Sequence, residues 1–280
     1  MIPTKRHIMT LKLNLKNDHI LRTIVVPVYN EAASAQKIID SIMQHIDAET
    51  RLILVQDGSD DGTAEILQDL ENSGFMQKNG IDLVNHLQNQ GYGKALVSGF
   101  KKSLEYKNAE YILTMDCDEQ HQPEDLHKFI SFANTDILSG SRYLMDIEKG
   151  ITAPADRVKI NSRLTEKYKK KAANMLDQTW RLTDSFCGMK RYRSDFIRDF
   201  LSRLPGAHGH ESCMGYGFPL LVWNFYLQWL KNQNKSLASS FAEIAIPKIY
   251  ISNDRTFGQL LDFPRKRYRY YLNCMKITFY

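Results

Sequence analysis

Apolar runs and amphipathic stretches alternate along the first 140 positions of the chain. Short runs of β-branched and leucine side chains predict five strands, over 23–28, 52–56, 81–84, 111–115 and 136–139. Apolar residues at helical spacing predict four helices between or after them, over 38–46, 61–70, 91–106 and 123–133. Strands that alternate with helices indicate βαβ units, so we expect an α/β fold with a mostly parallel sheet. In such sheets, ligands bind at the carboxyl ends of the strands.

The second half of the chain is less regular. Its apolar spacing predicts a long basic helix over 157–178 and shorter helices over 194–204 and 219–231. The segment 242–251 is predicted to form one strand, with Pro247 at an edge or a bulge because proline cannot donate to a sheet. No internal repeat and no glycine- or serine-rich linker interrupts the sequence, so one domain with short tails is the simplest interpretation.

The composition is that of a soluble globular protein. Of 280 residues, 43% are hydrophobic and 25% are charged, which excludes a disordered chain and a coiled coil. The four cysteines are far apart and form no Cys-x-x-Cys pair, as is typical of a protein in a reducing cytoplasm. The N-terminal residues are too polar for a signal peptide. The most apolar stretch, 212–230, is interrupted by glycines and a proline, and we expect no membrane-spanning helix.

Charge is distributed unevenly between the two halves. Residues 1–140 carry 13 basic and 20 acidic side chains, a net charge of −7, whereas residues 141–280 carry 24 and 12, a net charge of +12. The acidic half suggests a bound cation, and the basic half suggests an anionic partner such as a phosphate, a lipid head group or a nucleic acid. Solvated surface charge without any partner is the alternative.

Two aspartates follow the fourth predicted strand. Asp116 and Asp118 are two residues apart, and alternate residues of an extended backbone point to the same side. Paired carboxylates at a strand end suit a hard divalent cation such as Mg²⁺ or Mn²⁺, with Gln120 as a third oxygen donor. Such an ion completes its coordination with the phosphate oxygens of a substrate. The alternative is an acidic turn that caps the helix beginning at Pro123.

Polar turns also follow the first two predicted strands. After Pro27, Tyr29 offers a ring for stacking, and Glu31 can accept hydrogen bonds from a ribose or a base. Asp57 ends the second strand and can accept from the N–H group of a base. Each turn alone is explained by a helix N-cap. Three polar turns at one edge of a sheet, however, predict a shared ligand crevice.

Taken together, these segments resemble the family 2 glycosyltransferases, most closely the dolichol-phosphate mannose synthase-like members. The motifs VPVYNE, QDGSDDGT, MDCDEQHQPED and SGSRY carry the resemblance, which covers roughly residues 21–260. The resemblance implies a GT-A fold, a nucleotide-sugar donor linked to GDP or UDP, a divalent metal and inversion at the anomeric carbon.

The resemblance also implies site residues. It assigns the nucleotide-sugar to eight positions: Pro27, Tyr29, Glu31, Val55, Asp57, Cys117, Gln120 and Arg255. It assigns Mg²⁺ or Mn²⁺ to Asp116 and Asp118, with Gln120 beside them. The residues that it places in catalysis are Asp116, Asp118 and Arg142.

The acceptor decides whether the reaction needs a base. A hydroxyl acceptor must lose a proton, for which Asp184 and Glu211 are candidates. A lipid phosphate is already an anion and needs only cations to position it. The second half supplies five candidate cations: Arg142, Arg157, Arg163, Lys190 and Arg255. We therefore expect a hexosyltransferase with a polyprenyl-phosphate acceptor, and a glycan or another hydroxyl acceptor is the alternative.

Weaker patterns in the sequence favour different functions. The segment GYGKAL (91–96) opens a helix as a dinucleotide-binding loop does, but Leu96 replaces the third glycine and favours mere close packing. His208, His210 and Glu211 have zinc-ligand chemistry but are more typical of a polar loop. A nucleotidyltransferase would need a basic glycine-rich loop after the first strand. The basic aromatic C-terminus also suits a nucleic-acid or membrane-surface binding protein on a degenerate transferase fold.

The sequence thus predicts three regions: an N-terminal tail (1–20), a GT-A domain (21–255) and a basic, aromatic C-terminal segment (256–280). Within the domain, 21–145 is expected to bind the nucleotide-sugar and metal, and 146–255 to bind the acceptor. We expect a cytoplasmic enzyme, peripheral on the inner face of the membrane, with no nucleic-acid partner.

Overall fold

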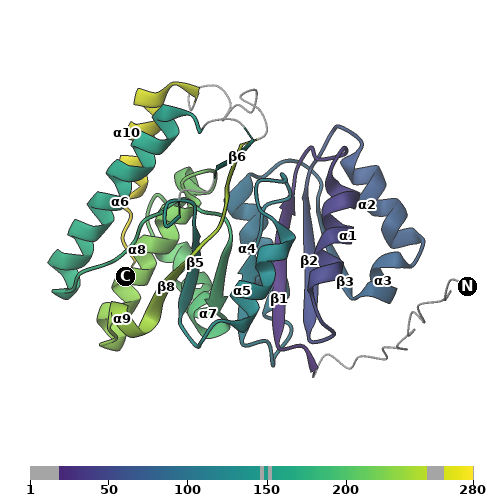
Figure 1. The fold of residues 1–280 in the computed structure, drawn as a ribbon, viewed down its shortest axis with the longest axis horizontal. Helices are drawn as coiled ribbons and strands as arrows, with labels where there is room; N and C mark the ends of the chain where they lie inside the picture. The colour runs from purple at the N-terminus through teal and green to yellow at the C-terminus, as the bar shows by residue number, and fades with distance from the viewer. Residues whose placement is uncertain (1–18, 146–147, 151–152, 251–261, 280) are drawn as a thin grey trace, which may run out of the picture.

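The structure, a computed structural model, describes residues 19–145, 148–150, 153–250 and 262–279 (Figure 1). Within these ranges, seven strands form one sheet in the order β3-β2-β1-β4-β7-β5-β8. Their bounds are β1 Arg22–Val28, β2 Thr50–Asp57, β3 Ile81–His86, β4 Tyr111–Thr114, β5 Ile137–Ser141, β7 Lys190–Arg193 and β8 Phe241–Ala245. A short ribbon pairs β6 (Glu148–Gly150) with β9 (Lys248–Tyr250). The five strands predicted in the first half are all present.

The sheet is parallel except for β7, which runs antiparallel between β4 and β5. This strand was not predicted, because its sequence, KRYR, contains three cations and no run of apolar residues. Lys190 and Arg191 are nevertheless buried. The Arg191 Nη1 and Nη2 atoms donate to the carbonyls of Phe129, Phe132 and Ala133, and these hydrogen bonds offset part of the cost of burial. The predicted mostly parallel α/β fold is confirmed.

Helices cover both faces of the sheet (Figure 1). One face packs against α1 (Ala35–His45), α2 (Thr63–Asn72), α3 (Phe75–Asn79) and α5 (Leu126–Ser131). The other face packs against α4 (Tyr92–Ser103), α6 (Ala155–Leu176), α7 (Ser194–Arg203), α8 (Phe218–Gln233) and α10 (Pro264–Cys274). Strand β1 serves both layers, since Ile24 and Val26 belong to the first core and Val25 to the second.

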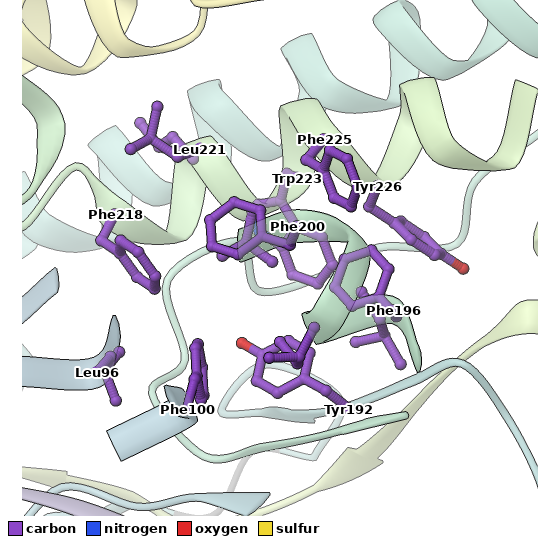
Figure 2. Close-up of a cluster of buried hydrophobic side chains, with 14 of the residues drawn as sticks. Leu96, Phe100, Tyr192, Phe196, Phe200, Phe218, Leu221, Trp223, Phe225 and Tyr226 are labelled. Carbon is purple, nitrogen blue, oxygen red and sulfur yellow. The ribbon is translucent and has the colours of Figure 1, made fainter. Parts of the chain in front are cut away.

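An aromatic core joins the second half of the chain to the sheet (Figure 2). The rings of Phe196 and Phe200 on α7 pack against Phe225 on α8, with centroids 5.4 Å apart in both pairs. Phe100 on α4 meets Tyr192 on β7 edge to face at 5.8 Å. Such pairs stabilise by about 1 kcal/mol each beyond the area they bury. This core therefore holds the less regular half in place without long strands.

Two local predictions were wrong. The expected strand over 242–251 is divided: β8 belongs to the main sheet and β9 to the short ribbon, because Pro247 interrupts the ladder between them. The expected helix over 123–133 is a 3₁₀ turn (η2, Pro123–Asp125) followed by α5. Within the C-terminal segment, Pro264–Cys274 form α10, which buries Tyr271 and Cys274 in the core. None of the helices in the described ranges has the length and apolar character of a membrane span.

Candidate functional site

A cavity of about 480 Å³ lies at the carboxyl ends of β1, β4 and β5 and is bounded on its far side by α6 and α10. Seven of the residues singled out in the sequence line it: Tyr29, Glu31, Asp116, Asp118, Gln120, Arg142 and Arg157. We call Tyr29, Glu31, Asp116 and Asp118 the strand-end group. Residues more distant in sequence complete the wall, among them Tyr92, Tyr143, Asn161, Tyr250, Arg267 and Tyr271.

The loops after β1 and β2 are fastened to each other by hydrogen bonds. Asn30, whose φ of 55° is left-handed, donates through Nδ2 to Asp60 at 2.8 Å and accepts from the Asp60 amide at 3.0 Å. The Glu31 amide donates to the Thr63 hydroxyl at 2.9 Å. Asp61 accepts from the amides of Ala32 and Thr63. The DGSDDGT segment therefore sets the position of Tyr29 and Glu31 at the cavity.

Four predicted nucleoside contacts do not line this cavity. Val55 is buried in the core, Cys117 is also buried, and Pro27 lies within β1. Asp57 is buried too, and its carboxylate accepts from the amides of Gln90 and Gly91 and pairs with His86 Nδ1 at 2.6 Å. The structure thus shows Asp57 holding the loop that opens α4. Arg255 lies outside the described residues.

Asp116 is held from three sides. The Tyr92 hydroxyl, at the first residue of α4, donates to Asp116 Oδ1 at 3.0 Å. Burial and the neighbouring Asp116 carboxylate raise the pKa of Tyr92 well above its usual value, so the hydroxyl keeps its proton. At Gly188, an added Cβ would lie 2.4 Å from Asp116 Oδ2, so only glycine leaves room for this carboxylate.

The third neighbour of Asp116 is His121, which is buried. Burial lowers the pKa of His121 to about 4, so the imidazole is neutral near pH 7. Its Nδ1 atom accepts from the Asp116 amide at 3.1 Å, and the proton therefore belongs on Nε2. Although Nδ1 also lies 3.5 Å from Asp116 Oδ2, a neutral acceptor nitrogen forms no ion pair there. His121 fixes the turn and leaves the negative charge of the Asp116 carboxylate intact.

The residues present fit a hard divalent cation. Asp116 and Asp118 both line the cavity, as does Gln120. The backbone amide of Gln120 donates to Asp118 Oδ1 at 3.1 Å. Two carboxylates and a neutral oxygen are the donors that Mg²⁺ and Mn²⁺ prefer. The cleared space at Gly188 keeps one of these carboxylates accessible. Among the described residues, no group of three His, Cys, Asp or Glu side chains is placed to hold a metal by itself.

A buried ion pair fixes Arg142, which follows β5, in the wall of the cavity. Arg142 Nε and Nη2 donate to the two oxygens of Asp184, at 2.7 and 3.0 Å. Asp184 is fully buried, which by itself raises its pKa, but the charge and hydrogen bonds of Arg142 lower it to about 2. Asn161 Nδ2 also donates to Asp184, at 2.7 Å. The bidentate geometry leaves the guanidinium group in one orientation.

Glu243 on β8 supports this pair through hydrogen bonds to the segment that carries Asp184. Its carboxylate accepts from the Thr183 amide and hydroxyl and from the Asp184 amide, at 2.8, 2.7 and 3.0 Å. Burial raises the pKa of Glu243 to about 7, although these three hydrogen bonds act in the opposite direction. The carboxyl group of Glu243, which titrates near neutrality, thus supports Asp184 and, through Asp184, the position of Arg142.

Two further arginines stand at the helical end of the cavity. Arg157 lies on the first turn of α6, and Arg267 lies on α10 with its side chain buried against Asp156. We call Arg142, Arg157 and Arg267 the arginine group. Sequence reasoning proposed Arg157 among the cations but did not single out Arg267. Its signal was present in the run RKRYRYY, where a helical spacing of four places Arg267 and Tyr271 on one face.

The remaining candidates lie elsewhere. Arg163 is exposed on α6, and Glu211 is exposed in the turn η4 (His210–Cys213), where it pairs with Lys94. Asp184, the other candidate base, is occupied by Arg142 and does not line the cavity. Lys190 is buried below the site, with its ammonium group bonded to the Cys187 carbonyl. In GYGKAL, the Gly93 amide donates to the Met214 carbonyl at 2.7 Å, as the close-packing interpretation predicts.

Known proteins with similar sequences were found over part of the chain. An uncharacterized protein of Methanocaldococcus jannaschii is 34% identical over 126 residues, 43% of this chain and 46% of that protein. The UDP-N-acetylglucosamine–dolichyl-phosphate N-acetylglucosaminyltransferase of Methanococcus voltae is 32% identical over 115 residues, 38% and 45% of the two chains. An undecaprenyl-phosphate 4-deoxy-4-formamido-L-arabinose transferase of Proteus mirabilis is 28% identical, over 40% and 33%. The matches therefore span less than half the length of these relatives.

Similarity of fold extends further. The glucosyl-3-phosphoglycerate synthase of Mycobacterium tuberculosis, solved with Mn²⁺, UDP and glucosyl-3-phosphoglycerate, superimposes with a TM-score of 0.58. The match covers 92% of this chain and 81% of that one at 16% identity, which shows a shared GT-A fold. The sequence profile described as glycosyl transferase family 2 matches residues 23–201, well over half of the chain. With the strand-end aspartates in one cavity of a GT-A fold, this chain belongs to glycosyl transferase family 2.

Proposed function

We propose that this protein transfers a hexose from a GDP- or UDP-linked donor to a polyprenyl phosphate, with inversion at the anomeric carbon and with Mg²⁺ or Mn²⁺. The observation that carries the proposal is the division of one cavity between carboxylates and arginines. The strand-end group comes from the loops after β1 and β4, and the arginine group comes from the end of β5 and from helices α6 and α10. A donor diphosphate that needs a cation and an acceptor phosphate that needs none fit this division.

The strand-end group is proposed to bind the donor. Tyr29 is exposed at the cavity, where its ring can stack on a base, and Glu31 can accept from a ribose hydroxyl. Asp116 and Asp118 would hold the metal. When bound, the metal supplies Lewis-acid stabilisation of the charge that grows on the leaving diphosphate.

The arginine group is proposed to bind the acceptor phosphate. Arg142 keeps a fixed orientation because Asp184 holds its Nε and Nη2 atoms. The planar guanidinium group then offers its other edge to phosphate oxygens. The Asp184 carboxylate neutralises part of the positive charge, so Arg157 and Arg267 are needed to make the end of the cavity attractive to an anion.

The reaction needs no enzyme base if the acceptor is a phosphate. A phosphate oxygen of the acceptor attacks the anomeric carbon, a new C–O bond forms, and the bond to the nucleoside diphosphate breaks on the opposite face. No proton is transferred. Among the described residues that line the cavity, the carboxylates are Glu31, Asp116 and Asp118, all in the strand-end group. This distribution favours the phosphate acceptor over a hydroxyl acceptor, which requires a base beside it.

Two relatives support the acceptor class, since their names specify dolichyl-phosphate and undecaprenyl-phosphate. The test is transfer of radiolabelled sugar from GDP-mannose, UDP-glucose or UDP-N-acetylglucosamine to a short-chain polyprenyl phosphate in detergent. We expect labelled lipid with wild type. We also expect Arg142→Ala to lose transfer by about 100-fold or more while nucleotide binding changes less than about threefold. Labelling of a soluble glycan with no lipid phosphate labelled by any donor would overturn the acceptor.

A further inference from the structure

Helices α6 and α10 lie side by side along one edge of the molecule, at the left of Figure 1. Three contacts join them in chain order, so the helices run parallel: Asp156 with Arg267, Arg163 with the ring of Tyr268, and Lys171 with the Met275 carbonyl. The inward faces of the pair supply Arg157, Arg267 and Tyr271 to the cavity. Both helices begin at this end of the cavity, since Arg157 and Arg267 lie on their first turns.

The outward faces are strongly basic. Four exposed cations on α6 are spaced by four, four and three residues, which places them on one side of the helix: Lys159, Arg163, Lys167 and Lys170. Three exposed cations lie on α10: Arg265, Lys266 and Arg269. The Arg163 guanidinium group lies 5.9 Å from the centre of the Tyr268 ring, which makes the two faces continuous. We call these seven residues the basic surface.

We propose that the basic surface binds the anionic face of a lipid membrane. Lysine and arginine near such a membrane contribute about fivefold each to affinity, so seven cations suffice for reversible binding. The inference rests on the proposed function in one respect: a polyprenyl-phosphate acceptor resides in a bilayer. Membrane contact through α6 and α10 would bring the bilayer to the end of the cavity that carries the arginine group.

An exposed aromatic side chain favours a membrane over a nucleic acid. Phe263, which precedes α10, is 59% exposed and lies beneath the Lys266 ammonium group, 4.7 Å from its ring centre. An apolar ring among cations is suited to the boundary between head groups and acyl chains. The acidic side chain that interrupts this part of α6, Glu166, is paired with Lys169. The surface therefore combines positive charge with an apolar anchor beside the end of the cavity that carries the arginine group.

The test is flotation of the full chain with vesicles of phosphatidylcholine alone or with about 30% phosphatidylglycerol. We expect binding to the anionic vesicles only, and loss of binding in about 0.5 M salt, where charges are screened within a few ångströms. A triple variant, Lys159→Gln, Arg163→Gln and Lys167→Gln, should bind about 100-fold more weakly. The matched control removes three exposed charges elsewhere, by Lys78→Gln, Lys107→Gln and Lys231→Gln, and should bind within about threefold of wild type.

Point substitutions are preferable to removal of the C-terminal segment, because α10 contributes Tyr271 and Cys274 to the core. Equal losses in the triple variant and its control would overturn the basic surface. The proposed membrane-binding role of the basic surface would also be overturned if wild type did not bind anionic vesicles but bound a single-stranded RNA homopolymer, with an affinity that depends on salt and on Lys159. Transfer to acceptor in detergent without vesicle binding would overturn this inference alone. Vesicle binding by the basic surface without transfer to any lipid phosphate would overturn the proposed function instead.

Discussion

The two sides of the cavity are built differently. In the strand-end group, Tyr29 and Glu31 follow β1 and are positioned by hydrogen bonds among exposed loop residues, such as Asn30 with Asp60. In the arginine group, Arg142 and Arg267 are positioned by ion pairs, and the pair between Arg142 and fully buried Asp184 joins residues 42 apart in sequence. Exposed loop bonds adjust at little cost, whereas breaking a buried pair costs several kcal/mol. We infer that the loop with Tyr29 and Glu31 tolerates change in its supports and that Arg142 does not.

The largest expected effect comes from breaking the buried pair. Asp184→Asn leaves the Arg142 charge uncompensated, so the free energy of unfolding should fall by about 3–5 kcal/mol. Urea denaturation at pH 7 measures this change. The comparison variant, Asp60→Ala beside the strand-end group, removes an exposed hydrogen-bond acceptor. It should lower the free energy of unfolding by less than about 1 kcal/mol. Equal losses in the two variants would show that both sides depend on their supports to the same extent.

The second effect concerns ligands rather than stability. Asp118→Asn removes a charged metal ligand from the strand-end group, so affinity for UDP or GDP in the presence of Mn²⁺ should fall by about 10- to 100-fold. Titration calorimetry with and without Mn²⁺ measures it. Glu119→Gln, which removes the same charge from the adjacent residue outside the cavity lining, is the control and should bind normally. Metal-independent binding that Asp118→Asn leaves unchanged would refute the metal assignment.

The third effect is a pH dependence of stability that arises beside the Arg142–Asp184 pair. Because the pKa of Glu243 is raised to about 7, its contribution to stability is fully present below its unfolded value near 4.5. That contribution is lost as the pH rises through 7, by about 2 kcal/mol between pH 5 and pH 8. Unfolding of wild type and Glu243→Gln over this range should show a fall in the first and a flatter profile in the second. Parallel profiles would exclude Glu243 as the titrating group.

The smallest effect tests the orientation of Asp116. Tyr92→Phe removes one hydrogen bond to a carboxylate and leaves the ring in place, so Mn²⁺-dependent nucleotide affinity should fall by about threefold to tenfold. Stability should change little, because the ring still fills its site. Tyr143→Phe, also in the cavity wall but beside Arg142 of the arginine group, should leave nucleotide affinity unchanged. A larger loss from Tyr143→Phe would place the nucleotide at the arginine group.

The first half of the fold was predictable because its signals are local. Each short apolar segment predicted as a strand, from β1 to β5, is a strand in the structure, and the polar turns after β1 and β4 line the cavity. Strand β7 was missed because its buried cations, Lys190 and Arg191, resemble a surface segment until their carbonyl partners are known. The hydrogen bonds of Asp57 were also not predictable, since its partners are the amides of residues 90 and 91 and the side chain of His86.

Sequence patterns alone were sufficient to predict the α/β architecture, the family and the strand-end aspartates, because periodicity and short motifs are properties of neighbouring residues. Which cations face the cavity, in contrast, depends on long-range packing. It pairs Arg142 with Asp184, brings Arg267 to the cavity wall from the C-terminal helix, and leaves Arg163 exposed on α6. Whether an arginine is a ligand, a buried partner or a surface charge depends on which helix packs against its own, and the packing is set by long-range contacts.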